Sequence, residues 1–244
     1  PPRSTLFPYT TLFRSLSAWI GIQAQTVQHE GSFTGTVIRQ VSLNYLLYLP
    51  ESYDPDKDKT WPLLVFLHGS GERGNDIEKI KVHGPPKLIE AGQHFPFIVL
   101  SPQCPDKRDW DAETIYALVK NIAGRYMVDE NRIYVTGLSM GGWATWDLAM
   151  AYPGYFAAIA PVCGRIDRNY PRRADELKSM PVWAFHGAAD DVVPVTDAAK
   201  MIRLLQDAGG NARITIYPGA NHDSWTETYN NPELYEWLLK QSRP

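Results

Sequence analysis

The sequence predicts an α/β fold in which helices cover both faces of a mostly parallel, doubly wound sheet. Three observations lead to this prediction. Short continuous apolar runs, typical of strands buried on both faces, alternate along the chain with segments of helical apolar spacing. A strand, a tight turn and a helix are indicated around Gly137-Leu138-Ser139-Met140-Gly141. The length of 244 residues suits one domain of this kind with a full core.

The bulk composition argues against nucleic-acid binding and against a membrane span. The formal net charge is −3, from 24 basic and 27 acidic side chains, and no basic patch points to nucleic acid. No apolar run is long enough to span a bilayer. Cys104 and Cys163 cannot by themselves build a metal site or a disulfide framework. A single bridge between them stays open, and it would require their Cα atoms to approach within about 7 Å.

The first 25 residues are expected to lie outside the catalytic domain. Residues 5–15 (TLFPYTTLFRS) resemble the in-frame translation of a sequencing adapter, so we expect residues 1–15 to be non-native and the sequence to come from an environmental assembly. Residues 16–22 are a short apolar run, and Gln23-Ala24-Gln25 resembles the end of a secretory signal; a stray surface strand or helix turn is the alternative. The signal interpretation predicts a secreted or periplasmic protein with one catalytic domain over residues 26–244.

The predicted elements begin at one edge of the sheet. Residues 36–41 and 43–49 are two β-rich runs joined by a short polar break, which predicts an N-terminal antiparallel hairpin. Residues 63–67 (LLVFL) and 96–100 (PFIVL) are then expected to form buried strands. A helix-like stretch through residues 87–91 lies between these two strands.

The second half of the chain alternates strands with helices. Residues 111–126 predict a helix, because their apolar side chains recur at a spacing that places them on one face. Strands are expected at 133–135, 156–162, 182–185 and 214–217, and helices at 143–150, 197–208 and 231–241. The segment 165–180 is polar and too short for a large lid, so the site should be open to bulky or polymeric substrates.

The turn around Ser139 has the form of a nucleophile elbow. Gly-x-Ser-x-Gly alone is a weak signal and also fits an ordinary turn, but a strand before it and a helix after it favour the catalytic interpretation. Ser139 would lie at the tip of the turn in a strained conformation, which Gly137 and Gly141 allow because they leave room where a Cβ would clash. The Met140 N–H would lie at the helix start, where unpaired N–H groups and the helix dipole favour negative charge.

Candidates for the acid and the base follow in the order Asp190, His222, each just past the end of a predicted strand. A serine hydroxyl needs a neutral imidazole to take its proton, and the imidazole needs a carboxylate to fix its tautomer. Asp190 is favoured over Asp191 by its place in Gly-x-x-Asp, and Asp223 is a third, weaker candidate. The histidines that lack either the chain order or the strand-end position are His29, His83, His94 and His186.

The loop after the first buried strand, residues 68–76 (HGSGERGND), is expected to complete an oxyanion hole. Its glycines let the backbone approach a substrate carbonyl, and we expect the Ser70 N–H to donate, with the Gly69 N–H as second choice. His68 directly follows a buried strand, so we interpret it as a residue that orients the loop through a hydrogen bond. Glu72 and Arg73 are expected to brace the loop.

Several motifs together resemble one family. HGSGERGND, SPQCP, GLSMGGWATWDLA, APVCG, HGAADDVVP and NHDSW, spread between about residues 43 and 241, are similar to the dienelactone-hydrolase-like "predicted peptidase" esterases of the α/β-hydrolase superfamily, which are close to phospholipase/carboxylesterase and feruloyl-esterase enzymes. The resemblance implies an α/β-hydrolase fold, ester hydrolysis without metal or cofactor, Ser139, Asp190 and His222 as triad, and Ser70 and Met140 as oxyanion donors. Dienelactone hydrolases proper use a cysteine nucleophile, so lactone cleavage is not implied.

These observations favour a serine carboxylesterase that acts on short acyl or aryl esters, with acetyl and feruloyl esters of plant polysaccharide as candidates. Trp110, Trp143 and Trp225 stand near motif ends and could form an aromatic wall, although core packing explains them equally well. A peptidase resembling the catalytic domain of prolyl oligopeptidases is the alternative, but the chain has no room for that family's propeller. A catalytically dead binding module is the third possibility, against which the intact Ser, Asp and His argue.

Overall fold

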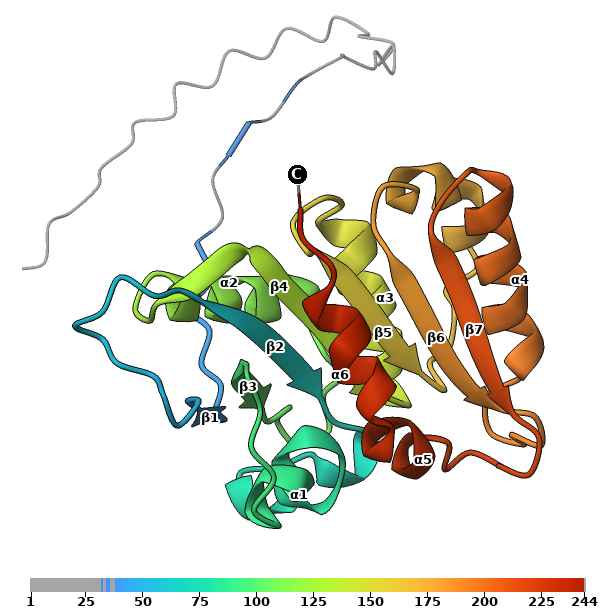
Figure 1. Cartoon of the computed structure of the whole chain (residues 1–244). Coiled ribbons are helices and arrows are strands. Elements are labelled where there is room, and N and C mark those ends of the chain that lie inside the picture. Colours follow the sequence, from blue (N-terminus) through green and yellow to red (C-terminus); the bar gives the residue numbers. More distant parts are fainter. Residues whose placement is uncertain (1–31, 33, 36–37, 244) are drawn as a thin grey trace, which may run out of the picture. The chain divides into compact units, whose positions relative to one another are not determined.

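A computed structural model of the chain describes residue 32, residues 34–35 and residues 38–243. The chain divides into two units, Pro1–Arg39 and Gln40–Pro244. All the helices and strands of the described residues belong to the second unit (Figure 1). The expected adapter-like and signal-like stretch, residues 1–25, lies outside the described residues.

One mixed sheet organises the second unit. Seven strands of the described residues form it in the order β1-β3-β2-β4-β5-β6-β7. All neighbouring strands are parallel except β1, which pairs antiparallel with β3. The strand bounds are β1 Tyr45–Tyr48, β2 Trp61–Leu67, β3 Ile98–Pro102, β4 Val128–Leu138, β5 Ala158–Val162, β6 Val182–Gly187 and β7 Ala212–Tyr217. The sequence-based prediction of an α/β fold with a mostly parallel sheet is therefore confirmed.

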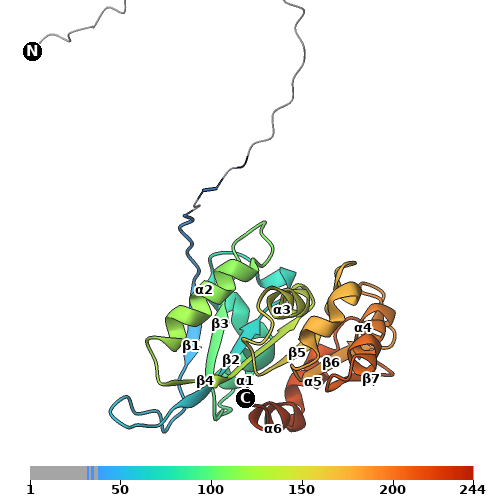
Figure 2. The same ribbon diagram turned by 90° about the horizontal axis from the view of Figure 1, so that it is seen from above.

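Helices cover both faces of this sheet. α2 (Ala112–Ala123), α3 (Met140–Ala151) and α4 (Val195–Asp207) supply side chains to one apolar core, and α5 (Trp225–Asn230) and α6 (Pro232–Leu239) supply side chains to the other. α1 (Gly84–Glu90) packs against the second core through partly buried side chains. Figure 2 shows α2 and α3 on the opposite side of the strands from α6. Short 3₁₀ segments, Ser70–Glu72, Ile77–Val82 and Tyr170–Leu177, complete the chain.

The central strands are buried as their apolar runs predict. Every residue of β2, β3, β5 and β6 is buried, whereas all of β1 and most of β7, the two edge strands, are half-buried or exposed. A strand with helices on both faces has no solvent side, which is why these sequences are continuously apolar and do not alternate. Because the inner strands are parallel, the loops at their carboxyl ends gather at one edge, where the site residues stand.

The N-terminal hairpin prediction is wrong in its pairing. Residues 38–41, the described part of the first expected strand, form no strand, and β1 pairs with β3, about fifty residues later in the chain. The β-rich run 43–49 correctly indicated a strand, but the partner of that strand depends on which sheet edge is open. α5 was not predicted, because its sequence, WTETYN, is short and has no apolar periodicity.

No helix in the described part of the chain is both long and apolar enough for a membrane crossing.

Candidate active site

Ser139 stands at a sharp turn between β4 and α3. Its backbone has φ 52° and ψ −112°, a conformation that costs free energy for a residue with a side chain. Two glycines make the turn possible: a Cβ at Gly137 would lie 2.5 Å from the Gly141 carbonyl oxygen, and one at Gly141 would lie 1.9 Å from the Leu67 carbonyl oxygen. The backbone of α3 thus approaches the end of β2 more closely than any other residue type permits.

His222 lies within hydrogen-bond distance of Ser139. Its Nε2 is 2.9 Å from Ser139 Oγ, and its Nδ1 is 2.9 Å from Asp190 Oδ2. An ionised carboxylate can only accept, so Nδ1 carries the proton and Nε2 is left as the acceptor for the serine hydroxyl. The side chain of His222 keeps 19% of its surface exposed, so one edge of the imidazole faces solvent.

Asp190 is held as a buried carboxylate by several donors. Its side chain is fully buried, and its Oδ1 accepts from the N–H groups of Val192 and Val193, each at 2.9 Å. Burial alone would raise the pKa of Asp190, but the hydrogen bonds from Val193, His222 and Val192 outweigh it and hold the pKa below its usual value. His186 Nε2 lies 3.1 Å from Asp190 Oδ2 and is a fourth polar neighbour. The sequence did not suggest this role for His186, which was set aside for its chain order.

The two competing carboxylates lie elsewhere. Asp191 is exposed. Asp223 accepts hydrogen bonds from the backbone N–H and the hydroxyl of Thr226, both at 3.0 Å, at the start of α5. Of the three aspartates considered, the structure brings Asp190 to His222.

The loop after β2 lies beside the elbow. A Cβ at Gly69 would stand 2.7 Å from a methyl group of Leu138, the residue before Ser139. Ser70 is exposed at the start of the 3₁₀ segment Ser70–Glu72, and Met140 is the first residue of α3. The N–H groups that begin a helix have no partner within it, so the Met140 N–H is free to meet an anion from that side.

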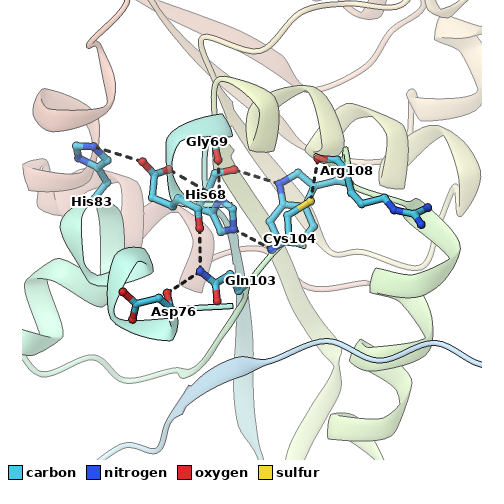
Figure 3. A network of polar contacts seen from close by, with 9 residues as sticks. His68, Gly69, Asp76, His83, Gln103, Cys104 and Arg108 are labelled. Carbon is cyan, nitrogen blue, oxygen red and sulfur yellow. Dashed lines mark hydrogen bonds and ion pairs between the residues drawn. The ribbon is translucent and has the colours of Figure 1, made fainter. Parts of the chain in front are cut away.

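His68 fixes the start of this loop through its ring and its backbone (Figure 3). The Cys104 N–H donates to Nε2 at 2.9 Å, so the proton sits on Nδ1, which donates to the Gly69 carbonyl at 2.6 Å. Trp110 Nε1 donates to the His68 carbonyl at 3.1 Å. Burial lowers the pKa of His68 to about 4, so the ring is neutral near pH 7. These contacts agree with a loop-orienting role for His68.

The three tryptophans considered as a substrate wall have different neighbours. Trp110 packs on His68, with 4.8 Å between ring centroids. Trp143, in the first turns of α3, is covered by the Arg165 guanidinium, 3.9 Å from its ring centroid. Trp225 meets the ring of His222 edge-on at 5.4 Å. All three are half-buried. Trp225 is the one that contacts a triad candidate, whereas Trp110 packs on His68 and Trp143 packs under Arg165.

Arg165 belongs to a polar hollow that sequence reasoning missed. The hollow measures about 610 Å³ and is lined by Arg165, Ile166, Asp167, Arg168, Asn169 and Asp197. It lies next to the elbow through Gly164, where a Cβ would be 2.7 Å from the Trp143 nitrogen. The charged residues of this loop were interpreted only as a short connection, because their spacing matches no motif.

Cys104 and Cys163 are both buried and free. The bridge that the sequence left open is therefore not formed. Within the residues that the structure describes, no three His, Cys, Asp or Glu side chains are grouped as metal ligands. Burial raises the pKa of Cys163 to about 12, so this thiol beside the elbow stays protonated.

The geometry of the site suits general-base activation of a hydroxyl. A neutral imidazole that faces Ser139 Oγ can take its proton, and the carboxylate of Asp190 stabilises the imidazolium that results. The loop of Gly69 lies against Leu138, the residue before the serine, and α3 begins directly after the serine.

Comparisons with known proteins place the chain among hydrolases. The sequence profile of the Dienelactone hydrolase family matches residues 102–234, which is more than half of the chain. An uncharacterized secreted protein of Arthroderma benhamiae is 28% identical over 212 residues, covering 71% of this chain and 23% of that protein. The bifunctional acetylxylan esterase/xylanase XynS20E of Neocallimastix patriciarum is 25% identical over 202 residues, covering 78% and 27%.

Among solved structures, a thermostable esterase is similar over most of the present fold. It matches with a TM-score of 0.71 and 35% sequence identity, covering 83% of this chain and 60% of that chain. This chain spans only about a quarter of the length of the two curated relatives above.

Proposed function

Because the chain belongs to the dienelactone hydrolase family, we propose that it is a serine carboxylesterase that works through an acyl-enzyme on Ser139. The observation that carries this proposal is the hydrogen-bonded series Ser139 Oγ, His222 and Asp190, with 2.9 Å at each step. The esterases among its relatives support ester hydrolysis as the reaction class.

In the first half-reaction, Ser139 Oγ attacks the carbonyl carbon of the ester while His222 Nε2 takes the hydroxyl proton. Negative charge moves to the carbonyl oxygen, where the N–H groups of Met140 and Ser70, with that of Gly69 as the alternative to Ser70, are the proposed donors. The tetrahedral intermediate then collapses. The bond to the alcohol oxygen breaks, and His222 gives that oxygen its proton.

In the second half-reaction, water replaces the alcohol. His222 takes a proton from the water, whose oxygen attacks the acyl carbon, and the carboxylic acid leaves as Ser139 Oγ regains a proton. Asp190 keeps the same tautomer of His222 through both halves, because its carboxylate accepts the Nδ1 proton throughout.

The proposed substrates are short acyl or aryl esters, including acetyl and feruloyl esters of plant polysaccharide. The connection between β5 and β6 is short and forms no large lid, which suits a bulky alcohol. The hollow beside Arg165 and the half-buried Trp143 and Trp225 are the proposed substrate surfaces. Values of kcat/KM on acetyl, butyryl and feruloyl esters test this, and equal values on all three would contradict the polysaccharide version.

A secreted or periplasmic location is part of the proposal. It rests on the signal-like residues before Gln25 and on the relative named as a secreted protein. Mass spectrometry of protein exported by a bacterial host should find an N-terminus near Gln25. Retention of the uncleaved chain in the cytoplasm would contradict it.

The reaction class is tested by labelling with a fluorophosphonate and mapping the labelled peptide, alongside turnover of a short p-nitrophenyl ester. We expect label on Ser139, ester turnover, and loss of both in Ser139→Ala. Rapid cleavage of proline-containing peptides would favour the peptidase alternative. Absence of both label and turnover in folded protein would favour the binding-module alternative.

A further inference from the structure

A series of side-chain contacts connects the loop after β2 to His222. It runs from Glu72, through His83 and Trp225, to the imidazole of His222. Glu72 Oε1 lies 3.9 Å from His83 Nε2. The His83 ring meets the ring of Trp225 edge-on at 5.4 Å, and Trp225 meets that of His222 at 5.4 Å and 89°. The series therefore joins the loop of the proposed oxyanion donors to the proposed base.

Glu72 is an unusual residue to find in this position. It is only 8% exposed, and its Oε2 is buried without a hydrogen-bond partner among the described residues. A Cβ at Gly69 would stand 3.3 Å from this oxygen, so the carboxylate lies beneath the turn that starts the loop. Its backbone carbonyl accepts from Gln103 Nε2 at 2.9 Å. A buried carboxylate oxygen without a hydrogen-bond partner lowers the stability of the folded protein. Stability therefore does not explain a glutamate at this position.

Two histidines lie on either side of the Glu72 carboxylate. His68 Nδ1 is 3.8 Å from Oε2, but its proton is already given to the Gly69 carbonyl. His83, labelled at the outer side of the network in Figure 3, has a half-buried ring and directly precedes α1. His83 is thus the neighbour whose ring lies between the Glu72 carboxylate and Trp225.

We propose that Glu72 and His83 are positioning residues that hold the Gly69–Glu72 loop in register with His222. This rests on the proposed function, since it concerns the same oxyanion loop and the same base. His68 ties the beginning of the loop to the Cys104 backbone, and the contacts of Glu72 tie its end to the α1 and α5 side of the site. The loop is thereby held at both ends, with Ser70 between them.

Loss of these contacts should weaken stabilisation of the transition state and leave substrate binding almost unchanged. A displacement of about 1 Å at a catalytic group can cost about 10²-fold in rate. If the oxyanion donors move relative to His222, the charge that develops on the carbonyl oxygen loses stabilisation, while ground-state binding changes little. A fall in kcat at constant KM is therefore the expected signature.

The test uses four single variants, one double variant and one matched control in the full chain. Glu72→Leu removes both oxygens at similar size, and Glu72→Gln keeps one acceptor. His83→Ala breaks the contact series, and His83→Phe keeps a ring against Trp225. The control is His94→Ala, because His94 also pairs with a glutamate, Glu51 at 3.3 Å, but both of these side chains are mostly exposed.

Kinetics with a p-nitrophenyl ester and affinity for phenylboronic acid, which forms a tetrahedral adduct with a serine nucleophile, are the main readouts. Glu72→Leu and His83→Ala should lower kcat by about 10-fold to 10²-fold with KM within about twofold, and boronate affinity should fall in parallel. Glu72→Gln and His83→Phe should recover most of the activity. The double variant Glu72→Leu/His83→Ala should be no worse than the poorer single variant, since the two act as one unit.

A second readout does not depend on turnover. Hydrogen exchange at the amides of residues 69–73 should speed up in Glu72→Leu and His83→Ala and stay unchanged in His94→Ala. Unchanged exchange, or kcat equal to that of the control, would overturn the positioning role even if ester turnover and Ser139 labelling stand. Conversely, an unlabelled Ser139 in wild-type protein would remove the proposed function, while exchange would still report on the contact series.

Discussion

Gly141 lies against Leu67 so closely that a Cβ on Gly141 would stand 1.9 Å from the Leu67 carbonyl oxygen. Leu67 ends β2, and Gly141 belongs to the first turn of α3. The contact brings the N-terminus of α3 to the point where the chain leaves β2 for the Gly69 loop. Two segments about seventy residues apart in sequence thus meet at Ser139, and the site depends on this approach.

Adding a single methyl group at this contact should disrupt the fold. Gly141→Ala would place Cβ inside a backbone carbonyl that cannot move alone, so we expect a loss of about 3 kcal/mol in the free energy of unfolding. Urea denaturation measures it. Gly219→Ala is the matched control, because nothing lies within 4 Å of its added Cβ, and its effect should stay within about 1 kcal/mol. Equal midpoints for the two variants would contradict the close approach.

The strained backbone at Ser139 should lower the free energy of unfolding for any residue there that carries a Cβ. Its φ of 52° suits glycine, so Ser139→Gly should be more stable than Ser139→Ala by about 1 kcal/mol. Both variants should lose ester turnover, since neither has a nucleophile. Thermal and urea unfolding of the pair checks the difference. An alanine variant as stable as the glycine variant would show that the backbone at this position relaxes.

The assignment of the acid predicts a large difference between neighbouring aspartates. Asp190→Asn should lower kcat by about 10⁴-fold, because the amide can donate to Nδ1 and favours the wrong tautomer of His222. Asp191→Asn and Asp223→Asn should stay within about threefold of wild type, since Asp191 is exposed and the Asp223 carboxylate accepts from Thr226. Steady-state kinetics on one ester decides it, and a larger loss in Asp191→Asn would refute the assignment.

His68 should make the protein sensitive to mild acid. The folded protein holds the pKa of His68 at about 4, whereas the unfolded chain takes up the proton near pH 6.5. The unfolded state therefore binds more protons between these values, and stability falls as the pH drops from about 6.5 to 4, by roughly 3 kcal/mol in total. Below the folded pKa this contribution no longer changes.

Urea unfolding at several pH values tests the His68 effect. His68→Gln should be less stable than wild type at pH 7, because it disturbs the bonds to Gly69 and Cys104, but its stability should depend less on pH in this range. His94→Ala should keep the wild-type slope, since that side chain is mostly exposed. A slope in His68→Gln as steep as in wild type would assign the acid sensitivity to other groups.

Much of the fold could be predicted from local patterns. The run LLVFL became β2 because a strand covered on both faces needs only apolar side chains, and Asp111 begins α2 as a cap whose side chain accepts from the Thr114 N–H at 2.9 Å. The strand–turn–helix around Ser139 followed from Gly-x-Ser-x-Gly in context. The order Ser139, Asp190, His222 was likewise enough to name three residues that the structure brings together.

Other features have no local signal. β1 was expected to pair within a hairpin, but it adds to the open edge beside β3, a choice made by the whole sheet. His83 and His186 were set aside for their positions in the chain, yet one lies beside Glu72 and the other beside Asp190. Their neighbours come from distant segments, so no window of sequence contains the contact.

The sequence by itself determined the alternation of strands and helices and the elbow at Ser139, because apolar periodicity and turn chemistry act between residues close in the chain. For the acid that faces His222 it offered Asp190 first, with Asp191 and Asp223 as alternatives. The tertiary structure alone decided which edge β1 joins, which aspartate faces His222, and how Glu72, His83 and Trp225 line up. Those outcomes depend on distances between elements, and distances are fixed only when the two cores pack and the carboxyl ends of parallel strands gather at one edge.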